Sequence, residues 1–317
     1  MGLQHVNIGK AAAMLALTDP ENKLSFTVDA AQGPVRLRYF APPVHLRPYF
    51  GSIYIFTVSV HGYSDVTRAD VPQLRFMIEG SGNYHFHDGT VMATPETCLL
   101  GPTMGATRFA LDGPAHALGV SLLPAGWAAL LGGDASAMAD RLVDPVAQRG
   151  LKRSKLMDEL RGITDAEAMA DHMWAILTEQ IALARPLAEN VWQILEAIDQ
   201  WLMHEGSPRI EALVEATGLS ARQLARLTNR YYGAPPKLLA RKYRALRCSA
   251  RIALDRENWQ SLLEDGRFYD QSHLIREIKH FIGLTPHQLL TEPSAVAQLT
   301  LLRRTLGADV AVLNRLS

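Results

Sequence analysis

The sequence has few cysteines, no excess charge of either sign and no long apolar run. Its two cysteines, Cys98 and Cys248, stand 150 positions apart among 317 residues. This spacing fits neither a disulfide framework nor a zinc site, so we expect a reducing, intracellular setting. No apolar run reaches the length of a membrane span, and the first residues show no signal-peptide pattern. We therefore expect a cytoplasmic protein without a membrane partner.

Charge is balanced overall but unevenly distributed. Basic and acidic residues number 32 each, which excludes a uniformly basic protein that coats nucleic acid or membranes. Residues 1–189 nevertheless carry a net charge of −4, and residues 190–290 carry a net charge of +3. The positive charge is concentrated between Leu219 and Asp255, where 37 residues hold nine basic groups and one acidic group. Such a local field favours an anionic polymer as the partner.

Short β-like segments dominate the first half. Gly-, Pro-, Asn- and Asp-containing turn signals separate brief apolar runs, which predict strands at Leu24–Val28, Val35–Phe40, Ile53–Val60, Leu74–Ile78 and Ala117–Leu122. Many short strands of this kind favour an antiparallel barrel or sandwich. From Ala125 the pattern becomes helical, and a clear apolar stripe marks a helix between Asp165 and Leu183.

The dipeptide Arg185-Pro186 ends that helix and marks a domain boundary. We predict an α+β chain with an N-terminal β-barrel domain at 1–186, helical over 125–185, an all-α domain at 187–290 and a helical tail at 291–317. The length and the 48% hydrophobic content are typical of globular domains of this size. We expect Arg303 and Arg304 of the tail to lie on a solvated face.

Residues 210–232 have the pattern of a helix-turn-helix. Ile210–Thr217 predicts a short helix, Gly218-Leu219-Ser220 predicts a tight turn, and Gln223 completes a capping box with Ser220 at the start of a second helix. The second helix turns Leu224, Leu227 and Tyr231 inward and Arg222, Ala225, Arg226 and Asn229 outward. An outward arginine pair near a helix N-terminus can bond guanine edges in a major groove.

A similar unit follows near residue 270. Asp270 caps a helix that turns inward Leu274, Ile278 and Phe281 and outward Gln271, Ser272, His273, Arg276 and Lys279. Thr285-Pro286 then starts a last short helix, with Gln288 completing another capping box. Between the two units, the 20 residues Pro236–Asp255 predict a helix of about 30 Å at about 1.5 Å per residue. Successive major grooves on one face of a duplex lie about 34 Å apart, so one chain can reach two of them.

From about Val191 to Leu290 the sequence resembles the DNA-binding domain of AraC/XylS-type transcriptional regulators. The segment FYDQSHLIREIKHFIGLTP at 268–286 is similar to the family signature around the second reading helix, and GLSARQLAR at 218–226 is similar to the first. The resemblance implies base-reading positions at Arg222, Ala225, Arg226, Ser272 and Arg276, with Gln271 and His273 adjacent. We expect phosphate contacts from the basic side chains Arg230, Lys237, Arg241, Lys242, Arg244 and Lys279.

Two departures from the family pattern affect the expected packing. Thr228 stands where the family usually has an aromatic residue, which predicts a lighter core beneath the first reading helix. Arg267 stands at the usual turn glycine of the second unit, with Gly266 one residue early. Because a non-glycine residue at positive φ is costly, we expect the first helix of the second unit to be displaced or less tightly packed.

Residues 24–127 loosely resemble the cupin-type barrel of such regulators, in the strand Gly119–Pro124 and the following Gly126-Trp127. This resemblance implies an N-terminal domain that senses a small molecule, mediates dimerisation, or does both. An apolar barrel interior is a suitable effector pocket. The stripe between Asp165 and Leu183 is either core or a dimer seam, and the resemblance favours a part in a homodimer.

The tripeptide His85-Phe86-His87 places two imidazoles on one face of a strand, a spacing that metal sites use. Metal cupins also need a carboxylate a few residues later, where this chain has Val91 and Met92, and Glu96 is too distant. We favour packing or solvent roles for both histidines, and we expect neither a metal nor another cofactor.

The residues and the resemblance together predict a sequence-specific DNA-binding transcriptional regulator and no catalytic residue. We expect an effector-responsive activator that works with RNA polymerase. Two alternatives stay open. A metal-dependent cupin-type enzyme would contain stoichiometric metal, and a regulator that acts through protein contacts would fail to shift DNA in a gel.

Overall fold

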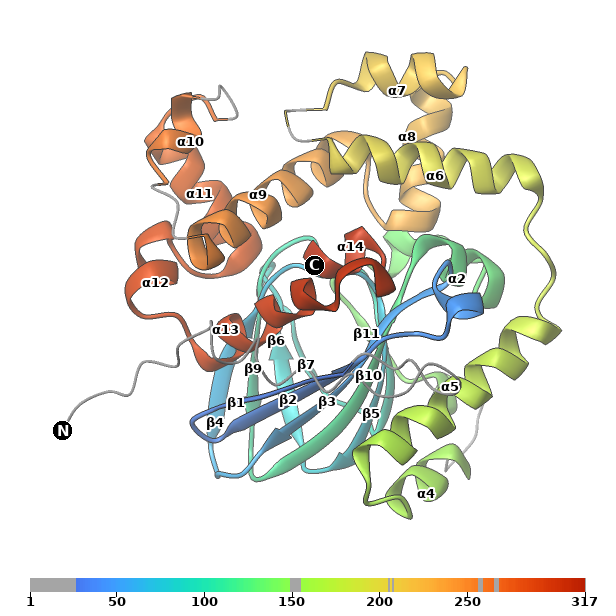
Figure 1. Ribbon diagram of the computed structural model, residues 1–317, viewed down its shortest axis with the longest axis vertical. Helices are drawn as coiled ribbons and strands as arrows, with labels where there is room; N and C mark the ends of the chain where they lie inside the picture. Colours follow the sequence, from blue (N-terminus) through green and yellow to red (C-terminus); the bar gives the residue numbers. More distant parts are fainter. Residues whose placement is uncertain are drawn as a thin grey trace.

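The computed structural model describes residues 27–148, 155–204, 206, 208–255, 259–264 and 268–316 (Figure 1). Antiparallel sheets from the first half of the chain form one end of the molecule, and helices from the second half form the other. The predicted α+β class is therefore confirmed. None of the helices in these described ranges is long and apolar enough to cross a membrane.

Among the described residues, the larger sheet has seven antiparallel strands in the order β1-β2-β3-β10-β5-β8-β11. Their bounds are β1 Thr27–Gln32, β2 Val35–Phe40, β3 Phe50–Val58, β5 Gln73–Glu79, β8 Thr97–Leu100, β10 Ala115–Leu122 and β11 Leu142–Val143. Gln32 pairs with Val35, so Gly33 and Pro34 form a two-residue hairpin turn, and Gly33 adopts the positive φ (+56°) that such turns require. Four predicted strands fall on β2, β3, β5 and β10, whereas most of Leu24–Val28 lies outside the described residues.

The smaller sheet has the strand order β4-β9-β6-β7. These strands are β4 Tyr63–Thr67, β6 Gly82–His85, β7 Val91–Ala93 and β9 Thr107–Leu111. The rings of Phe56 on β3 and Phe109 on β9 meet edge to face with centroids 5.9 Å apart, so the two sheets face each other. Strand pairing between the described residues does not close the sheets into one continuous barrel.

The two faces of the larger sheet have different neighbours. Along β5, Leu74, Phe76 and Ile78 pack in the core shared with helices, whereas Gln73, Arg75 and Met77 line the space between the sheets. This alternation follows from the two-residue period of a strand. The helices and turns that accompany the sheets are η1 Val44–Leu46, α2 Pro124–Leu130, η2 Ala135–Met138, α3 Pro145–Gln148, α4 Lys155–Arg161 and α5 Ala166–Leu183.

Helix α5 accounts for the apolar stripe seen in the sequence. The side chain of Asp165 accepts a hydrogen bond from the Ala168 amide at 2.8 Å and so caps the helix. Met169, Met173 and Leu177 are buried in the same cluster as Phe50 on β3. The stripe therefore packs against the larger sheet of its own chain, and a dimer seam is not needed to explain it.

Helices make up the described part of residues 189–291. They are α6 Glu189–Met203, α7 Ile210–Thr217, α8 Ala221–Tyr232, α9 Pro236–Leu254, α10 Ser261–Glu264, α11 Gln271–Ile282 and α12 Pro286–Thr291. Leu213, Leu224, Leu246 and Leu274 are fully buried in one shared core. Leu262 of the short helix α10 is also fully buried, while Gly266 and Arg267 lie outside the described residues.

The chain ends in three short helical segments that return to the sheets (Figure 1). These are α13 Ala295–Leu301, η3 Leu302–Asp309 and α14 Val312–Leu316. The prediction of a solvated face for Arg303 is wrong, because its side chain is 2% exposed, and Arg304 is half-buried. Leu299, Leu306 and Val310 pack against β1 and β2, which turns Arg303 inward toward Asp70.

Candidate nucleic-acid interface and interior pocket

The first reading unit consists of α7, a glycine turn and α8. Gly218 ends α7 in the left-handed conformation (φ +66°), and the Ser220 and Gln223 side chains form the predicted capping box. Leu224 and Tyr231 are buried, as predicted for the inward face. On the opposite face Arg222 and Arg226 are exposed and Ala225 is half-buried. The arginine pair is therefore accessible near the N-terminus of α8.

The second reading unit presents α11 in a similar way. The Asp270 carboxylate accepts the His273 amide at 2.7 Å and caps the helix. Leu274, Ile278 and Phe281 are fully buried. The outward positions Gln271, Ser272, Arg276 and Lys279 are exposed. His273 is half-buried, because its ring packs edge to face on Phe268 at 5.6 Å and its Nδ1 accepts the Tyr269 amide.

The residues expected to contact phosphates occupy three different environments. Arg230, Lys237 and Lys279 are exposed, although one Arg230 amino group also donates to the Gly132 carbonyl at 3.3 Å. Arg241 and Arg244 both form ion pairs with Glu277. Lys242 differs from the expected surface position, because it is 1% exposed and donates to the Asp70 carbonyl oxygen at 2.6 Å. In this arrangement the Lys242 ammonium cannot reach a phosphate.

Glu277 joins the connecting helix α9 to the reading helix α11. Its carboxylate accepts two hydrogen bonds from Arg241, at 2.6 and 3.1 Å, and lies 3.5 Å from Arg244. Burial alone would raise the pKa of Glu277, but the hydrogen bonds and charge of Arg241, together with Arg244, keep that pKa below its ordinary value. The carboxylate is therefore ionised at neutral pH and fixes α11 on α9.

The C-terminal end of each reading helix contacts the β-sheet half of the molecule. Phe281 and His280 at the end of α11 accept main-chain hydrogen bonds from Ala69 and Ala106, each at 2.7 Å. At the end of α8, Gly233 has φ +84°, and a side chain there would lie 2.3 Å from Pro102. Both reading helices are thus docked by their C-terminal ends, which leaves their N-terminal turns directed away from the sheets.

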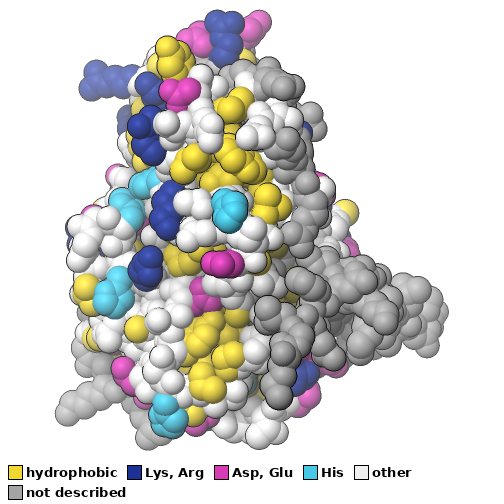
Figure 2. All heavy atoms as spheres, turned by 90° about the vertical axis from the view of Figure 1, so that its left-hand side faces the viewer, with side chains coloured by type: hydrophobic (Ala, Val, Ile, Leu, Met, Phe, Trp, Pro, Cys, Tyr) yellow, Lys and Arg dark blue, Asp and Glu magenta, His cyan; other side chains and the backbone are white. Residues whose placement is uncertain are grey.

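Basic side chains gather on the helical half of one face (Figure 2). In that view Lys and Arg side chains follow one edge of the upper part of the molecule, while acidic side chains are scattered. Arg222, Arg226, Arg276 and Lys279 are among the exposed cations of the helical half. A positive edge of this kind attracts a polyanion over distances of about 8 to 10 Å at physiological salt.

A cavity of about 80 Å³ lies between the two sheets. By the same measure one water molecule needs about 10–15 Å³, so the cavity has room for a small organic molecule. Its walls are mainly apolar and aromatic, with Leu37, Tyr54, Phe56, Met77, Tyr84 and Phe109 among them. Four charged side chains also line it, namely Arg68, Asp70, Arg75 and Arg303.

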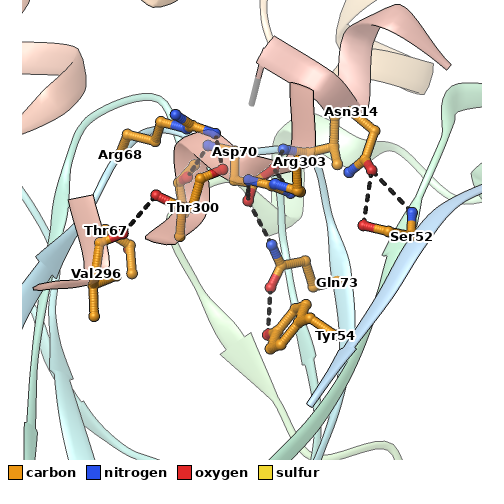
Figure 3. A network of polar contacts seen from close by, with 12 residues as sticks. Ser52, Tyr54, Thr67, Arg68, Asp70, Gln73, Val296, Thr300, Arg303 and Asn314 are labelled. Atoms are coloured by element: carbon orange, nitrogen blue, oxygen red, sulfur yellow. Dashed lines mark hydrogen bonds and ion pairs between the residues drawn. The ribbon is translucent and has the colours of Figure 1, made fainter. Parts of the chain in front are cut away.

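A network of polar contacts crosses one end of the cavity (Figure 3). The Asp70 carboxylate accepts hydrogen bonds from Arg303 Nη2 at 2.8 Å and from Gln73 Nε2 at 2.7 Å. Gln73 Oε1 in turn accepts the Tyr54 hydroxyl and Arg75 Nε, each at 2.8 Å. The hydrogen bonds therefore run without a break from Arg75 inside the cavity to Arg303 on η3.

The network holds buried charges whose pKa values reflect their surroundings. Burial acts to raise the pKa of Asp70, but Arg303 and the other nearby cations keep it below its ordinary value. Burial lowers the pKa of Arg68 to about 9, and the positive charge of Arg303 adds to this effect. Burial likewise lowers the pKa of Lys242 to about 8, against the opposing attraction of Asp70. Asp70, Arg68 and Lys242 are therefore ionised in large part at neutral pH.

Residues 213–292 match the family model of a helix-turn-helix domain. The chain carries an AraC-type helix-turn-helix domain. Domains of this type belong to DNA-binding transcriptional regulators. The matched helix-turn-helix domain spans both reading helices described above and the connecting helix α9 between them. No curated protein matches the chain.

Several solved structures are similar at low identity. ToxT from Vibrio cholerae O395 is 10% identical with a TM-score of 0.40, over 75% of this chain and 97% of that chain. Wild-type ToxT from Vibrio cholerae strain SCE256, in a structure with bound unsaturated fatty acid, is 10% identical with a TM-score of 0.41, over 77% and 96%. Vicilin from the hazelnut Corylus avellana is 6% identical with a TM-score of 0.26, over 30% of each chain. All three TM-scores lie below 0.5.

The two histidines with metal-like spacing do not come together as ligands. His85 is exposed at the end of β6, whereas His87 lies beyond the strand and bonds Asp140 at 3.1 Å. The described residues contain no group of three His, Cys, Asp or Glu side chains that could hold a metal. The two cysteines are buried, at 1% and 0% exposure for Cys98 and Cys248.

Sequence reasoning missed three residues of the site. Glu277 was detectable, because it lies on the inward stripe of α11 with Leu274 and Phe281, where an acidic residue needs a partner. Asp70 and Arg303 had no local signal. They are 233 positions apart, and only the return of the chain end to the sheets brings them together.

Proposed function

We propose that this chain is a sequence-specific, effector-responsive transcriptional regulator that reads two adjacent major grooves with α8 and α11. The observation that carries the proposal is the matched presentation of the two helices. Each buries its apolar face in the shared core and exposes arginine near its N-terminal half, Arg226 on α8 and Arg276 on α11. We assign sensing to residues 1–186, DNA reading to 187–290 and a tail to 291–317.

Base reading is assigned to Arg222, Ala225, Arg226, Gln271, Ser272, His273 and Arg276. Phosphate contact is assigned to the exposed cations Arg230, Lys237 and Lys279. Arg241 belongs to this group in part, because its side chain is 42% exposed beside Glu277. Lys242 does not belong to the group, since its side chain is buried between α9 and Asp70, and Arg244 is a partner of Glu277.

Selection of duplexes from a random pool by the full chain, followed by titration of the selected site, tests this proposal. We expect Arg226→Ala and Arg276→Ala each to cost about 1–3 kcal/mol on the selected site and to relax preference at one base position. Arg185→Ala serves as the matched control, because Arg185 is exposed in the segment between α5 and α6. Equal losses on the selected site and on random DNA would contradict base reading. Absence of any shifted complex would favour a regulator that acts through protein contacts.

The cavity is the proposed effector site, and its lining favours an apolar molecule with one acidic group. Arg75 lies 5.0 Å from the Tyr84 ring and 5.9 Å from the Tyr54 ring, and its Nε donates to the neutral Gln73 Oε1. Three arginines and one aspartate give the lining a net positive charge. A carboxylate on Arg75, with its apolar body among the aromatic side chains, satisfies both features.

Displacement of the fluorescent probe 1-anilinonaphthalene-8-sulfonate from the full chain tests this ligand class. We expect apolar carboxylic acids to displace the probe at least about tenfold better than the matched alcohols, because a buried charged hydrogen bond is lost in the alcohols. Arg75→Gln should remove that preference, whereas Arg36→Gln, an exposed arginine of the β1–β2 hairpin, should keep it. Equal displacement by acids and alcohols would argue against an acidic effector.

We also propose that the protein acts as an activator, with RNA polymerase as a partner, and as a homodimer. A dimer would place four reading helices on a site with two half-sites, so the selected site should be a repeat. The mass of the protein in solution tests the dimer directly.

A further inference from the structure

The last part of the chain, residues 294–316, lies between the sheets and the helix-turn-helix domain, and we call it the C-terminal strap. Its α13 and η3 pack against β1 and β2, with Val296, Leu299, Leu306 and Val310 buried in that cluster. Its α14 instead buries Leu313 and Leu316 in the core of the helix-turn-helix half. The strap therefore contacts both halves of the molecule (Figure 1).

Polar contacts fix the strap to the sheets at several points. Asn314 Oδ1 accepts hydrogen bonds from the Ser52 amide at 2.9 Å and from its hydroxyl at 3.1 Å. The Val296 amide donates to the Asp65 carboxylate at 3.0 Å, and Arg68 donates to the Thr300 carbonyl at 2.8 Å. At the centre, the Arg303–Asp70 ion pair is almost fully buried, with side-chain exposures of 2% and 13%. The strap is thus held by specific contacts and not by apolar packing alone.

The same strap is a wall of the cavity. Val296, Thr300 and Arg303 line it, and Figure 3 shows Arg303 pointing from the strap toward Asp70, with Gln73 and Tyr54 beyond. A molecule in the cavity therefore touches the strap or the hydrogen-bonded residues that hold it.

Asp70 and its neighbour connect this point to the helix-turn-helix domain. The Asp70 carbonyl oxygen accepts Lys242 Nζ of α9 at 2.6 Å. The adjacent Ala69 amide donates to the Phe281 carbonyl at the end of α11, at 2.7 Å. Residues 69 and 70 thus bond to the strap, to the connecting helix and to the second reading helix at once.

We propose that the C-terminal strap is a clamp that fixes the helix-turn-helix domain on the sheets and that occupation of the cavity loosens it. The ligand part of this inference rests on the proposed effector site. A carboxylate bound to Arg75 competes with Gln73 for that guanidinium, and Gln73 is the residue that also holds Asp70. Weakening of the Asp70–Arg303 pair then releases the strap and the contacts that residues 69 and 70 make with α9 and α11.

Hydrogen exchange of the full chain tests the clamp without any ligand. In Arg303→Gln we expect the Ala69 and Ala106 amides, which bond the end of α11, to exchange about tenfold or more faster than in the unaltered chain. The amide of Leu118, at the centre of the larger sheet, should stay as protected as before. Arg36→Gln is the matched control, because it removes an arginine–aspartate pair that is exposed and distant from the strap.

A milder variant covers the case in which Arg303→Gln fails to fold. Arg303→Lys keeps a positive charge beside Asp70 but loses the arginine geometry, so we expect intermediate exchange at Ala69 and Ala106. If the folded Arg303 variants exchange at these two amides no faster than Arg36→Gln, the clamp is overturned. The affinity for the selected duplex tests the functional role of the strap. Because Arg303→Gln leaves every proposed DNA contact in place, we expect any change in affinity to come from the loosened strap, and we expect it to be at least about threefold. Faster exchange with unchanged affinity would reduce the strap to a structural element and overturn its regulatory role.

Hydrogen exchange with added ligand distinguishes a failure of the clamp from a failure of the proposed effector site. Addition of the apolar carboxylic acid that best displaces the probe should speed exchange at Ala69 and Ala106 in the unaltered chain, and not in Arg75→Gln. If Arg303→Gln gives the expected result and no acid binds, the effector proposal fails while the clamp stands. If acids bind and leave the two amides unchanged, the effector site stands and its coupling through the strap fails.

Discussion

The two reading units present similar surfaces to solvent but are attached to the molecule in different ways. Helix α11 is held by the Glu277 ion pairs to α9 and by two main-chain hydrogen bonds to the sheet half. Helix α8 is held through its buried apolar face, the close approach of Gly233 to Pro102, one hydrogen bond from Arg230 and the contacts of the Tyr232 hydroxyl with α6. Both helices thus bury an apolar face in the shared core, and α11 is fixed in addition by ion pairs to α9 and by main-chain hydrogen bonds to the sheets.

The largest expected loss of stability comes from removing the ion pairs that hold α11 on α9. Glu277→Ala removes the carboxylate that pairs with Arg241 and Arg244, and we expect a loss of about 2–4 kcal/mol in the free energy of unfolding. The range is set below that of a fully buried pair, because the Arg241 side chain is 42% exposed. Urea denaturation measures the loss.

Glu211 on α7 supplies the control for this variant in the first unit. Its pair with Arg209 is 3.5 Å long and exposed at both ends, so Glu211→Ala should change stability by less than about 0.5 kcal/mol. Glu277→Gln keeps the shape and a hydrogen-bond acceptor. Its loss of stability should therefore lie between those of Glu277→Ala and Glu211→Ala. If Glu277→Ala were as mild as Glu211→Ala, the contrast between the two attachments would have no energetic basis.

We expect the free energy of unfolding to depend on pH through a buried contact beneath the first unit, with an effect of intermediate size. Tyr232 at the end of α8 lies 2.5 Å from the Asp199 carboxylate of α6 and 3.1 Å from the Leu195 carbonyl. Burial raises the pKa of Asp199 to about 7, an effect that the hydrogen bond from Tyr232 opposes only in part. A protonated Asp199 can donate to the phenol oxygen while the phenol donates to Leu195, so both groups are satisfied.

The sign of this effect follows from proton binding. Between about pH 4 and pH 7 the folded chain retains a proton on Asp199 that the unfolded chain releases, so the free energy of unfolding falls as pH rises through this window. Asp199→Asn mimics the protonated group and should remove this slope. Because Asp199 is half-buried, we discount the full shift and expect the variant to be about 1–2 kcal/mol more stable at pH 8. Urea denaturation at pH 4.5 and pH 8 measures this, and an equal difference at both pH values would contradict the assignment.

Local signals in the sequence predicted much of the helical half, because caps and glycine stops act over a few residues. Ser220, Asp270 and Thr285 cap α8, α11 and α12, as predicted, and Gly283 ends α11 at φ +85°. Contacts between distant segments could not be predicted in this way. The burial of Lys242 and Arg303 depends on Asp70, which is 172 positions from one and 233 from the other. The shortest strands, β7 and β11, have three and two residues and too little pattern to detect.

The smallest effect is expected at Thr228 beneath α8, where the DNA-binding domains that the sequence resembles usually have an aromatic residue. Thr228 is fully buried, and its hydroxyl donates to the Ala225 carbonyl of its own helix at 3.2 Å. The hydroxyl therefore has a partner, and the site holds a side chain of this size without an aromatic ring. Thr228→Val removes only that local bond and keeps the volume, so the free energy of unfolding should change by less than about 1 kcal/mol. Thr228→Phe should instead destabilise the fold by about 1–3 kcal/mol, since neighbouring buried side chains must move. Thermal unfolding of both variants checks this order, and a stabilising phenylalanine would show that the core beneath the first unit is underfilled.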